Sequence, residues 1–321
     1  MNALPPKMKA VVYHQFGDPK VLRLEELPIP KIKQGEVLIQ TKAVALNPVD
    51  CSLRKGKLKM VNIPGKRGRI PGSDFAGIIV KAGNKVKKFK PGQSVYGFLP
   101  PLKGGASAEY LVAKESQISL MPERLTFEEA AALPLAGLTA LQALRNLARL
   151  KVGEVVFIHG ASGGVGTLAI QIARNLGAEI YATSSRNKHD MIRKLGSDQV
   201  MVHSKSTIVE LKECFDVFFD VYGNMPYQKI KHLLFPRGRH ITTLPSFQNF
   251  LMAFLCKLFS FKGSDVVIVK STGKDLDTLS EWVNNGSIDP VIDRSMPLHE
   301  ISKAHDYIET KKASGKIILT M

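Results

Sequence analysis

The stretch VVFIHGASGGVG, residues Val155–Gly166, decides the fold. Its first five residues, Val155–His159, form an apolar run typical of a buried strand, and glycines follow at once. Beyond them, the apolar residues between Ala169 and Ala173 give one face of a helix. A strand that turns into a helix through glycines predicts the first unit of a doubly wound parallel sheet.

Such a turn favours a dinucleotide. Glycines let the backbone approach a pyrophosphate closely, and the amides at a helix N-terminus donate to it. The spacing GxxGxxG departs from the commonest fingerprint, and glycines that serve packing alone are the alternative. A second strand about 20 residues on supports the dinucleotide. We assign the following residues to the cofactor: Gly160, Ser162, Gly163, Gly164, Val165 and Gly166.

The residues after the second strand select the nucleotide. An NAD site usually ends this strand with a carboxylate that holds the ribose hydroxyls, but here no carboxylate appears before Asp190. Ser184 and Ser185 can donate hydrogen bonds to a 2′-phosphate, and Arg186 and Lys188 can pair with its charge. We therefore expect NADP(H), the alternative being that the two cations are merely exposed.

Alternation of strands and helices extends from this turn along the chain. The predicted strands are Val155–His159, Glu179–Thr183, Gln199–Val202, Val217–Asp220, His240–Leu244 and Val266–Val269. The predicted helices are Gly137–Leu147, Gly164–Leu176, Lys188–Leu195 and Tyr227–Leu234. Thr126 and Glu129 have the spacing of a capping box before them. We also assign Leu244, where a predicted strand ends, to the cofactor.

The segments before and after this alternating region show a different pattern of predicted elements. Strands separated by turn residues are predicted at Lys9–Tyr13, Glu36–Val44, Phe75–Lys81, Ser94–Phe98 and Ala108–Val112. The tail adds helices at Asp275–Asn285 and Glu300–Lys311 and a strand at Lys316–Leu319. The expected domains are a β-rich domain of residues 1–122, completed by 270–321, and a nucleotide-binding domain of residues 123–269.

Composition excludes several classes of protein. Of the 321 residues, 44% are apolar and 23% are charged, which is ordinary for a globular chain and rules out wholesale disorder. The longest apolar run, Phe250–Cys256, is too short to span a membrane. Cys51, Cys214 and Cys256 lie far apart, so neither a disulfide framework nor a four-cysteine zinc site is expected. Because the N-terminus lacks the pattern of a secretion signal, we expect a cytoplasmic or organelle-matrix protein.

Charge is the unusual property. Lys and Arg total 45 against 28 Asp and Glu, a net charge of +17. Basic residues cluster at Lys55–Arg69 and Lys81–Lys90. A solvated basic surface is the simplest interpretation, and contact with RNA or association with a membrane surface stays open.

Motifs outside the glycine turn resemble the medium-chain dehydrogenase/reductase superfamily, specifically its zinc-free quinone oxidoreductase branch. They are Leu46–Asp50, Ile70–Gly77, Gly104–Tyr110, Leu133–Ala140 and Gly315–Leu319. The resemblance implies a GroES-like β-rich catalytic domain, a Rossmann domain and an active cleft between them.

The resemblance also indicates whether the site binds a catalytic metal ion. Zinc-dependent relatives bind a catalytic ion through a cysteine and a histidine, where this sequence has Asn47 and Ser73. An amide and a hydroxyl are poor zinc ligands, so we expect no metal. A metal held by Asp50 and Asp74 is the alternative.

Without a Lewis acid the substrate must accept hydride readily, as quinones and α,β-unsaturated carbonyl compounds do. The resemblance puts Asn47 and Thr139 beside the nicotinamide and the reacting oxygen, and brings Lys316 to the cofactor. Tyrosines that follow the Asn-Pro motif in related enoyl-thioester reductases are missing from Cys51–Leu58. Their absence argues against thioester reduction, which stays an alternative together with a non-enzymatic protein that binds NADPH, RNA or a membrane surface.

Two segments near the end of the nucleotide-binding domain complete the predictions. Phe247–Phe261 carries aromatic residues at helical spacing and would form a lid over an apolar substrate or pack in the core. Val266–Val269 is predicted to be an edge strand through which two copies pair into a homodimer.

Overall fold

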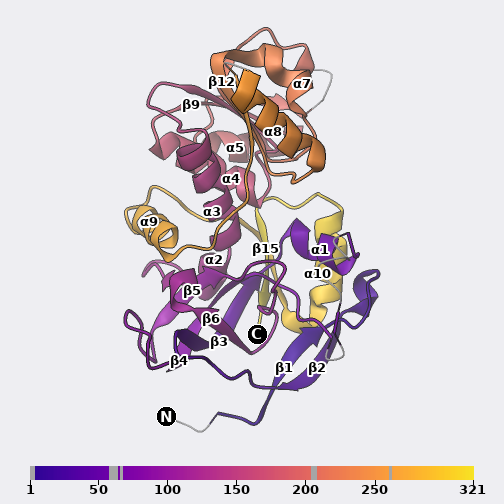
Figure 1. The fold of residues 1–321 in the computed structure, drawn as a ribbon, viewed down its shortest axis with the longest axis vertical. Helices are drawn as coiled ribbons and strands as arrows, with labels where there is room; N and C mark the ends of the chain where they lie inside the picture. Colours follow the sequence, from indigo (N-terminus) through magenta and orange to yellow (C-terminus); the bar gives the residue numbers. More distant parts are fainter. Residues whose placement is uncertain (1–3, 58–63, 66–67, 204–207, 260–261) are drawn as a thin grey trace. The chain divides into compact units, whose positions relative to one another are not determined.

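The computed structural model describes residues 4–57, 64–65, 68–203, 208–259 and 262–321 (Figure 1). The chain forms two compact units. The first comprises Met1–Leu135, Lys270–Gly286 and Pro290–Met321, and the second comprises Ala136–Val269 and Ser287–Asp289. The sequence analysis placed the first boundary at residue 122. The first unit extends further because α2, Phe127–Ala131, packs against its strands.

The second unit is built on a six-stranded parallel sheet with the strand order β10-β9-β8-β11-β12-β13. The strands are β8 Val155–His159, β9 Glu179–Ser184, β10 Gln199–Val202, β11 Phe215–Asp220, β12 Leu234–Thr242 and β13 Gly263–Val266. Chain order reverses between β8 and β11, which is the switch point where doubly wound sheets bind ligands. The predicted Rossmann sheet is confirmed.

Helices α4, α5, α7 and α8 lie in this unit, and α3 enters it at Ala136 (Figure 1). They are α3 Pro134–Leu141, α4 Gly164–Asn175, α5 His189–Lys194, α7 Tyr227–Ile230 and α8 Phe247–Phe259, with a π-helical turn at Gln142–Leu147. The core under them includes Phe157, which stacks on Phe218 with ring centroids 4.8 Å apart. A well-packed aromatic layer of this kind holds the strands in register.

The first unit contains a seven-stranded sheet of order β14-β15-β3-β4-β5-β7, with β6 paired to β3, and a separate β1-β2 pair. The strands are β1 Lys7–Val12, β2 Arg23–Pro28, β3 Glu36–Ala45, β4 Asp74–Ala82, β5 Ser94–Phe98, β6 Tyr110–Lys114, β7 Ile118–Leu120, β14 Ile292–Pro297 and β15 Lys316–Thr320. The helices are α1 Pro48–Arg54, α2 Phe127–Ala131, α9 Gly273–Asn284 and α10 Ile301–Glu309.

The pairing of the strands brings the predicted site residues of this unit together. The last strand, β15, pairs antiparallel with β3, and β3 pairs with β4. Ala45 lies opposite both Ile318 and Asp74. Three segments far apart in the sequence therefore converge where β3 ends and α1 begins.

The capping box was predicted correctly, whereas several short elements were not. Thr126 caps α2 and forms the predicted capping box with Glu129. Short polar strands were missed, because β2 and β14 lack an alternating apolar pattern. Helix α1 was also missed.

Two strand predictions were wrong in position. The predicted strand His240–Leu244 shares only His240–Thr242 with β12, which begins at Leu234 in a polar, partly exposed stretch and ends at Thr242. The predicted edge strand Val266–Val269 shares only Val266 with β13. The reason is register: Gly263 pairs with Arg239 and Val266 with Thr242, where β12 ends. Among the described residues no helix is long and apolar enough to cross a membrane.

The glycine turn depends on close backbone packing between β8 and α4. Gly160 has φ +89°, a conformation that costs side chains with a Cβ free energy. A Cβ on Gly166 would lie 2.4 Å from the carbonyl oxygen of Gly160, which is rigid backbone. Both positions therefore require glycine for structural reasons, independently of any ligand.

We predict that Gly166→Ala lowers the free energy of unfolding by about 1–3 kcal/mol, because the new methyl group cannot be accommodated without moving the backbone. Gly263→Ala is the matched control in the same unit, since its Cβ would meet nothing closer than 3.5 Å. Urea unfolding of the two variants measures the difference. Equal stabilities would show that the turn tolerates a side chain.

Candidate functional site

The glycine turn is held by a buried histidine and threonine. Nδ1 of His159 lies 2.8 Å from Oγ1 of Thr183, and Nε2 lies 2.9 Å from Oδ1 of Asn224. Gly160 donates its amide to the same Thr183 hydroxyl at 3.2 Å, and Ala161 donates to the Thr183 carbonyl at 3.0 Å. His159 is thus structural, and the first two amides of the turn are already used.

The backbone amides at the start of α4 have no such partner from a capping side chain. Gly163 is the N-cap residue of α4 and supplies no side-chain cap. The first amides of a helix have no partner within the helix, and they carry the positive end of its dipole. An uncapped N-terminus of a twelve-residue helix at the switch point of the sheet fits a phosphate group.

Beyond β9 the chain forms the second half of this site. Ser184 is buried, and Arg186 is exposed in the short 3-10 turn Arg186–Lys188. The residue after this turn, His189, has a buried Nε2 with no hydrogen-bond partner among the described residues. An unpaired buried nitrogen is costly unless a ligand pairs with it. Together these groups fit a phosphorylated ribose, and the sequence analysis missed His189.

The remaining predicted residues of this unit are placed as follows. Leu244 lies just after β12, is 45% exposed and donates its amide to the Thr242 hydroxyl at 3.3 Å. It thus borders the same carboxyl edge of the sheet as the glycine turn, because β8 and β12 are parallel. Thr139 is buried within α3.

In the first unit Asn47 begins α1 but does not cap it with its side chain. Its Nδ2 donates to Oδ2 of Asp74 at 2.9 Å and to the carbonyl of Ala45 at 3.3 Å. Its Oδ1 accepts from Nζ of Lys316 at 2.6 Å. A carboxamide has two N–H donors, so both are occupied.

Lys316 and Asp74 form the charged part of this cluster. Nζ of Lys316 lies 2.9 Å from Oδ2 of Asp74, with both side chains buried. The other carboxylate oxygen of Asp74 accepts the amide of Leu135 at 2.7 Å. An ammonium has three donors, and two are accounted for here. We name Asn47, Asp74 and Lys316 the buried triad.

Asp50 adjoins the triad from the first turn of α1. Its Oδ2 accepts the backbone amide of Asn47 at 2.9 Å. Burial raises the pKa of Asp50 to about 7, the charge of Asp74 adds to this shift, and Lys316 opposes it. One buried ammonium therefore serves two carboxyl groups, of which Asp74 is the ion-pair partner.

Ser73 contributes a buried hydroxyl for which the described part of the chain offers no partner. Such a group is available to a ligand. Asp50 and Asp74, the alternative metal ligands, are engaged with Asn47 and Lys316 instead. Across the described ranges, no three His, Cys, Asp or Glu side chains are grouped so that they could hold a metal ion.

A second buried cluster lies behind α1. Sγ of Cys51 is 3.3 Å from Nδ1 of His305, and the buried Arg54 pairs with Glu309 of α10. Burial raises the pKa of the Cys51 thiol to about 12 and lowers that of His305 to about 3. A protonated thiol is a poor nucleophile, so this cluster holds α1 against α10.

The structure thus brings Asn47 and Lys316 together in one unit, and gathers the glycine turn, the residues after β9 and Leu244 at one sheet edge in the other. Sequence reasoning found the glycine turn and the residues after β9 through local patterns, and Asn47 and Lys316 through the family resemblance. It treated Asp74 and Asp50 only as alternative metal ligands, because the pairing of Asp74 with Lys316 across 242 residues depends on sheet register.

Two family models match the chain. The alcohol dehydrogenase GroES-like domain matches residues 33–123, and the zinc-binding dehydrogenase domain matches residues 195–319.

Individual proteins match over nearly the whole length. A 2-methylene-furan-3-one reductase of Solanum lycopersicum is 35% identical, covering 99% of this chain and 80% of the relative. An NADPH-dependent alkenal/one oxidoreductase, chloroplastic, of Arabidopsis thaliana is 34% identical with the same coverage. The solved quinone oxidoreductase of Coxiella burnetii superposes with a TM-score of 0.88 at 31% identity, covering 98% of this chain and 99% of that one.

We predict that Asp74→Asn and Lys316→Met each lower the free energy of unfolding by about 3–5 kcal/mol, because each leaves a buried charge unpaired. The double variant should lose clearly less than the sum of the two, since neither charge then remains. A double-mutant cycle in urea measures the coupling. Additive losses would show that the ion pair contributes nothing specific.

We predict a pH signature for Asp50. Its raised pKa means that the folded state binds the proton more tightly than the unfolded state, so this stabilisation is present below about pH 4 and lost as pH rises through 7. Asp50→Asn removes the effect. From pH 5 to pH 8 the unfolding free energy of the variant should gain about 2–3 kcal/mol relative to the wild type. Parallel curves for the two proteins would contradict the assignment.

Proposed function

Because the chain belongs to the quinone oxidoreductase branch of the medium-chain dehydrogenase/reductase superfamily, we propose that it is an NADPH-dependent reductase of quinones or α,β-unsaturated carbonyl compounds. The observation that carries this proposal is the buried triad. It occupies the region where zinc-dependent members place a metal ligand, and it holds a buried cation there instead, fixed by Asn47 and Asp74.

NADPH fits the second unit. The amides at the start of α4 would hold the pyrophosphate, and Ser184, Ser185, Arg186 and Lys188 would hold the 2′-phosphate. When bound, the nicotinamide supplies a hydride. The name of the Arabidopsis relative supports the phosphorylated form of the nucleotide.

The contacts of the triad define what its members can do. Asn47 has no amide hydrogen left for a substrate oxygen, so we assign it a positioning role: its Oδ1 fixes the ammonium of Lys316. Lys316 retains one donor for the cofactor or for a developing oxyanion. We keep Thr139 as a contact of the nicotinamide, as the family resemblance implies, and Leu244 as a contact of the cofactor.

Donor chemistry supports metal independence. A carboxamide already bonded to Asp74 and Lys316, and the hydroxyl of Ser73, are poor ligands for zinc. A substrate reduced here must therefore spread negative charge without a Lewis acid. A quinone takes hydride and a proton to become a hydroquinone; an enone takes hydride at its β carbon and a proton at its α carbon. We assign proton delivery to water or a cofactor hydroxyl.

We also infer a cytoplasmic homodimer. Within the described part of the sheet, β13 pairs with β12 on one side alone, so its other edge can pair with a second copy. The corrected edge is Gly263–Val266 rather than Val266–Val269. A mass of 35.3 kDa in sedimentation equilibrium would exclude the pair.

We predict steady oxidation of NADPH with quinones and short-chain enones, and turnover of free enones above that of crotonyl thioesters. Absorbance at the nicotinamide band across an acceptor panel measures this. Faster thioester turnover would favour an enoyl-thioester reductase. No turnover with any acceptor, together with tight binding of RNA or anionic lipid, would favour the non-enzymatic rival.

We predict that Arg186→Ala/Lys188→Ala weakens NADPH binding at least tenfold and leaves NADH binding within about twofold, because NADH carries no 2′-phosphate with which the two cations could pair. Arg193→Ala, an exposed residue of α5 paired with Asp190, is the matched control. Calorimetric titration with both nucleotides measures the ratio. Equal losses for NADPH and NADH would remove the 2′-phosphate assignment.

A further inference from the structure

Helix α8 turns its apolar face toward solvent. Phe247, Phe254, Leu258 and Phe259 are 82%, 60%, 57% and 81% exposed. With Phe250, Leu251 and Leu255, also exposed, they follow the spacing of a single helical stripe. A stripe of this kind ordinarily faces a core, so its exposure indicates a binding surface.

The opposite side of α8 is anchored to its own unit. Ala253 and Cys256 are buried, and Lys257 forms an ion pair with Asp265 of β13 at 2.7 Å. The helix therefore has a fixed inner face and a free apolar outer face. Phe261, which the sequence analysis assigned to the same segment, lies outside the described residues.

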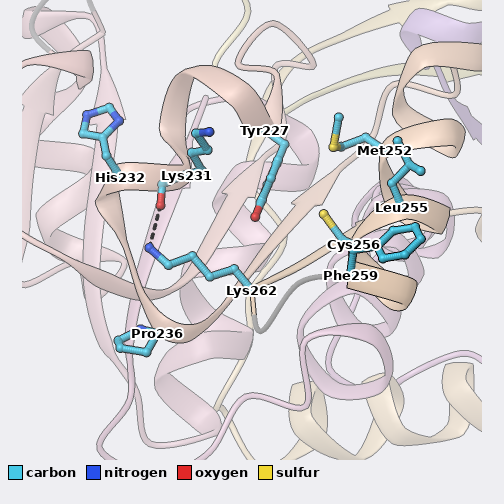
Figure 2. A pocket seen from close by; sticks show the side chains of 9 residues that line it. All are labelled: Tyr227, Lys231, His232, Pro236, Met252, Leu255, Cys256, Phe259 and Lys262. Atoms are coloured by element: carbon cyan, nitrogen blue, oxygen red, sulfur yellow. Dashed lines mark hydrogen bonds between the residues drawn. The ribbon is translucent and has the colours of Figure 1, made fainter.

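A groove of about 770 Å³ runs beside the helix. Figure 2 shows Met252, Leu255 and Phe259 on one side of it and Lys231, His232 and Lys262 across from them. The ammonium of Lys262 is held there by the carbonyls of Lys231 and Leu234, at 2.8 and 2.6 Å. Apolar and cationic groups thus share one surface.

The sequence around this surface is unusually one-sided in charge. Between Asp220 and Asp265 there is no Asp or Glu, and the cations are Lys229, Lys231, Arg237, Arg239, Lys257 and Lys262. Lys229, Lys231 and Arg237 are exposed. The net charge of residues 221–264 is therefore +6, counted with neutral histidines.

We propose that α8 and the basic residues beside its groove bind the surface of an anionic membrane. An apolar stripe flanked by lysines matches the acyl boundary and the headgroups of such a bilayer at once. At about 20 Å the helix suits lying in the interface. Seating the same surface of a second copy on it would instead bring like charges together, which is unfavourable.

Flotation of the full chain with vesicles tests this surface. The wild type should bind vesicles of phosphatidylcholine and phosphatidylglycerol at least about tenfold more tightly than phosphatidylcholine alone. Phe254→Ser/Leu258→Ser and Lys229→Glu/Lys231→Glu should each weaken that binding by about tenfold or more. All four substituted residues are exposed, so folding should be preserved.

Lys85→Glu/Lys87→Glu is the matched control. It changes the net charge by the same amount, from exposed positions in the basic cluster Lys81–Lys90. It should alter binding by less than about twofold. An equal effect of both charge reversals would overturn the proposal in favour of nonspecific attraction. Unchanged vesicle binding of Phe254→Ser/Leu258→Ser would overturn it too. If the mass of this variant in solution were then half that of the wild type, the occupant of the stripe would be a second copy. If its KM for quinones were raised, the helix would be a substrate lid.

Discussion

The first unit depends on one buried ammonium. Lys316 is the first residue of the last strand, and its charge is matched by Asp74 at the start of β4 and by the amide oxygen of Asn47 at the start of α1. A buried charge without these partners would destabilise the unit by about 3–5 kcal/mol. The pairing therefore fixes where three distant segments meet, and it sets the electrostatic character of the site.

The same pairing explains a division of roles. Asp74 holds Lys316 and orients Asn47 through its amide, so Asn47 is a support for the cation rather than a donor to substrate. Asp50, close by and raised in pKa, stays largely neutral below pH 7 and spares the cation a second negative neighbour. The remaining N–H of this ammonium is suited to stabilising a developing oxyanion.

Sequence reasoning succeeded where the signal is local. The glycine turn could be predicted because backbone approach and free amides require glycine at fixed positions after a strand. It failed where the cause is not local. The pairing of Asp74 with Lys316 comes from register between strands, and β13 was misplaced because β12 ends at Thr242. The buried Nε2 of His189, which no group in the described part of the chain pairs, is visible only once its surroundings are folded.

The most direct test of the central claim, hydride transfer from NADPH without metal, is the fate of a label. Enzyme dialysed against a chelator would reduce an enone with NADPH deuterated at the reactive carbon of the nicotinamide, and the product would be weighed by mass spectrometry. We expect one deuterium at the β carbon, and the same rate as with undialysed enzyme and the same deuterated NADPH. A product without deuterium, or reduction that returns only when zinc is restored, would contradict it.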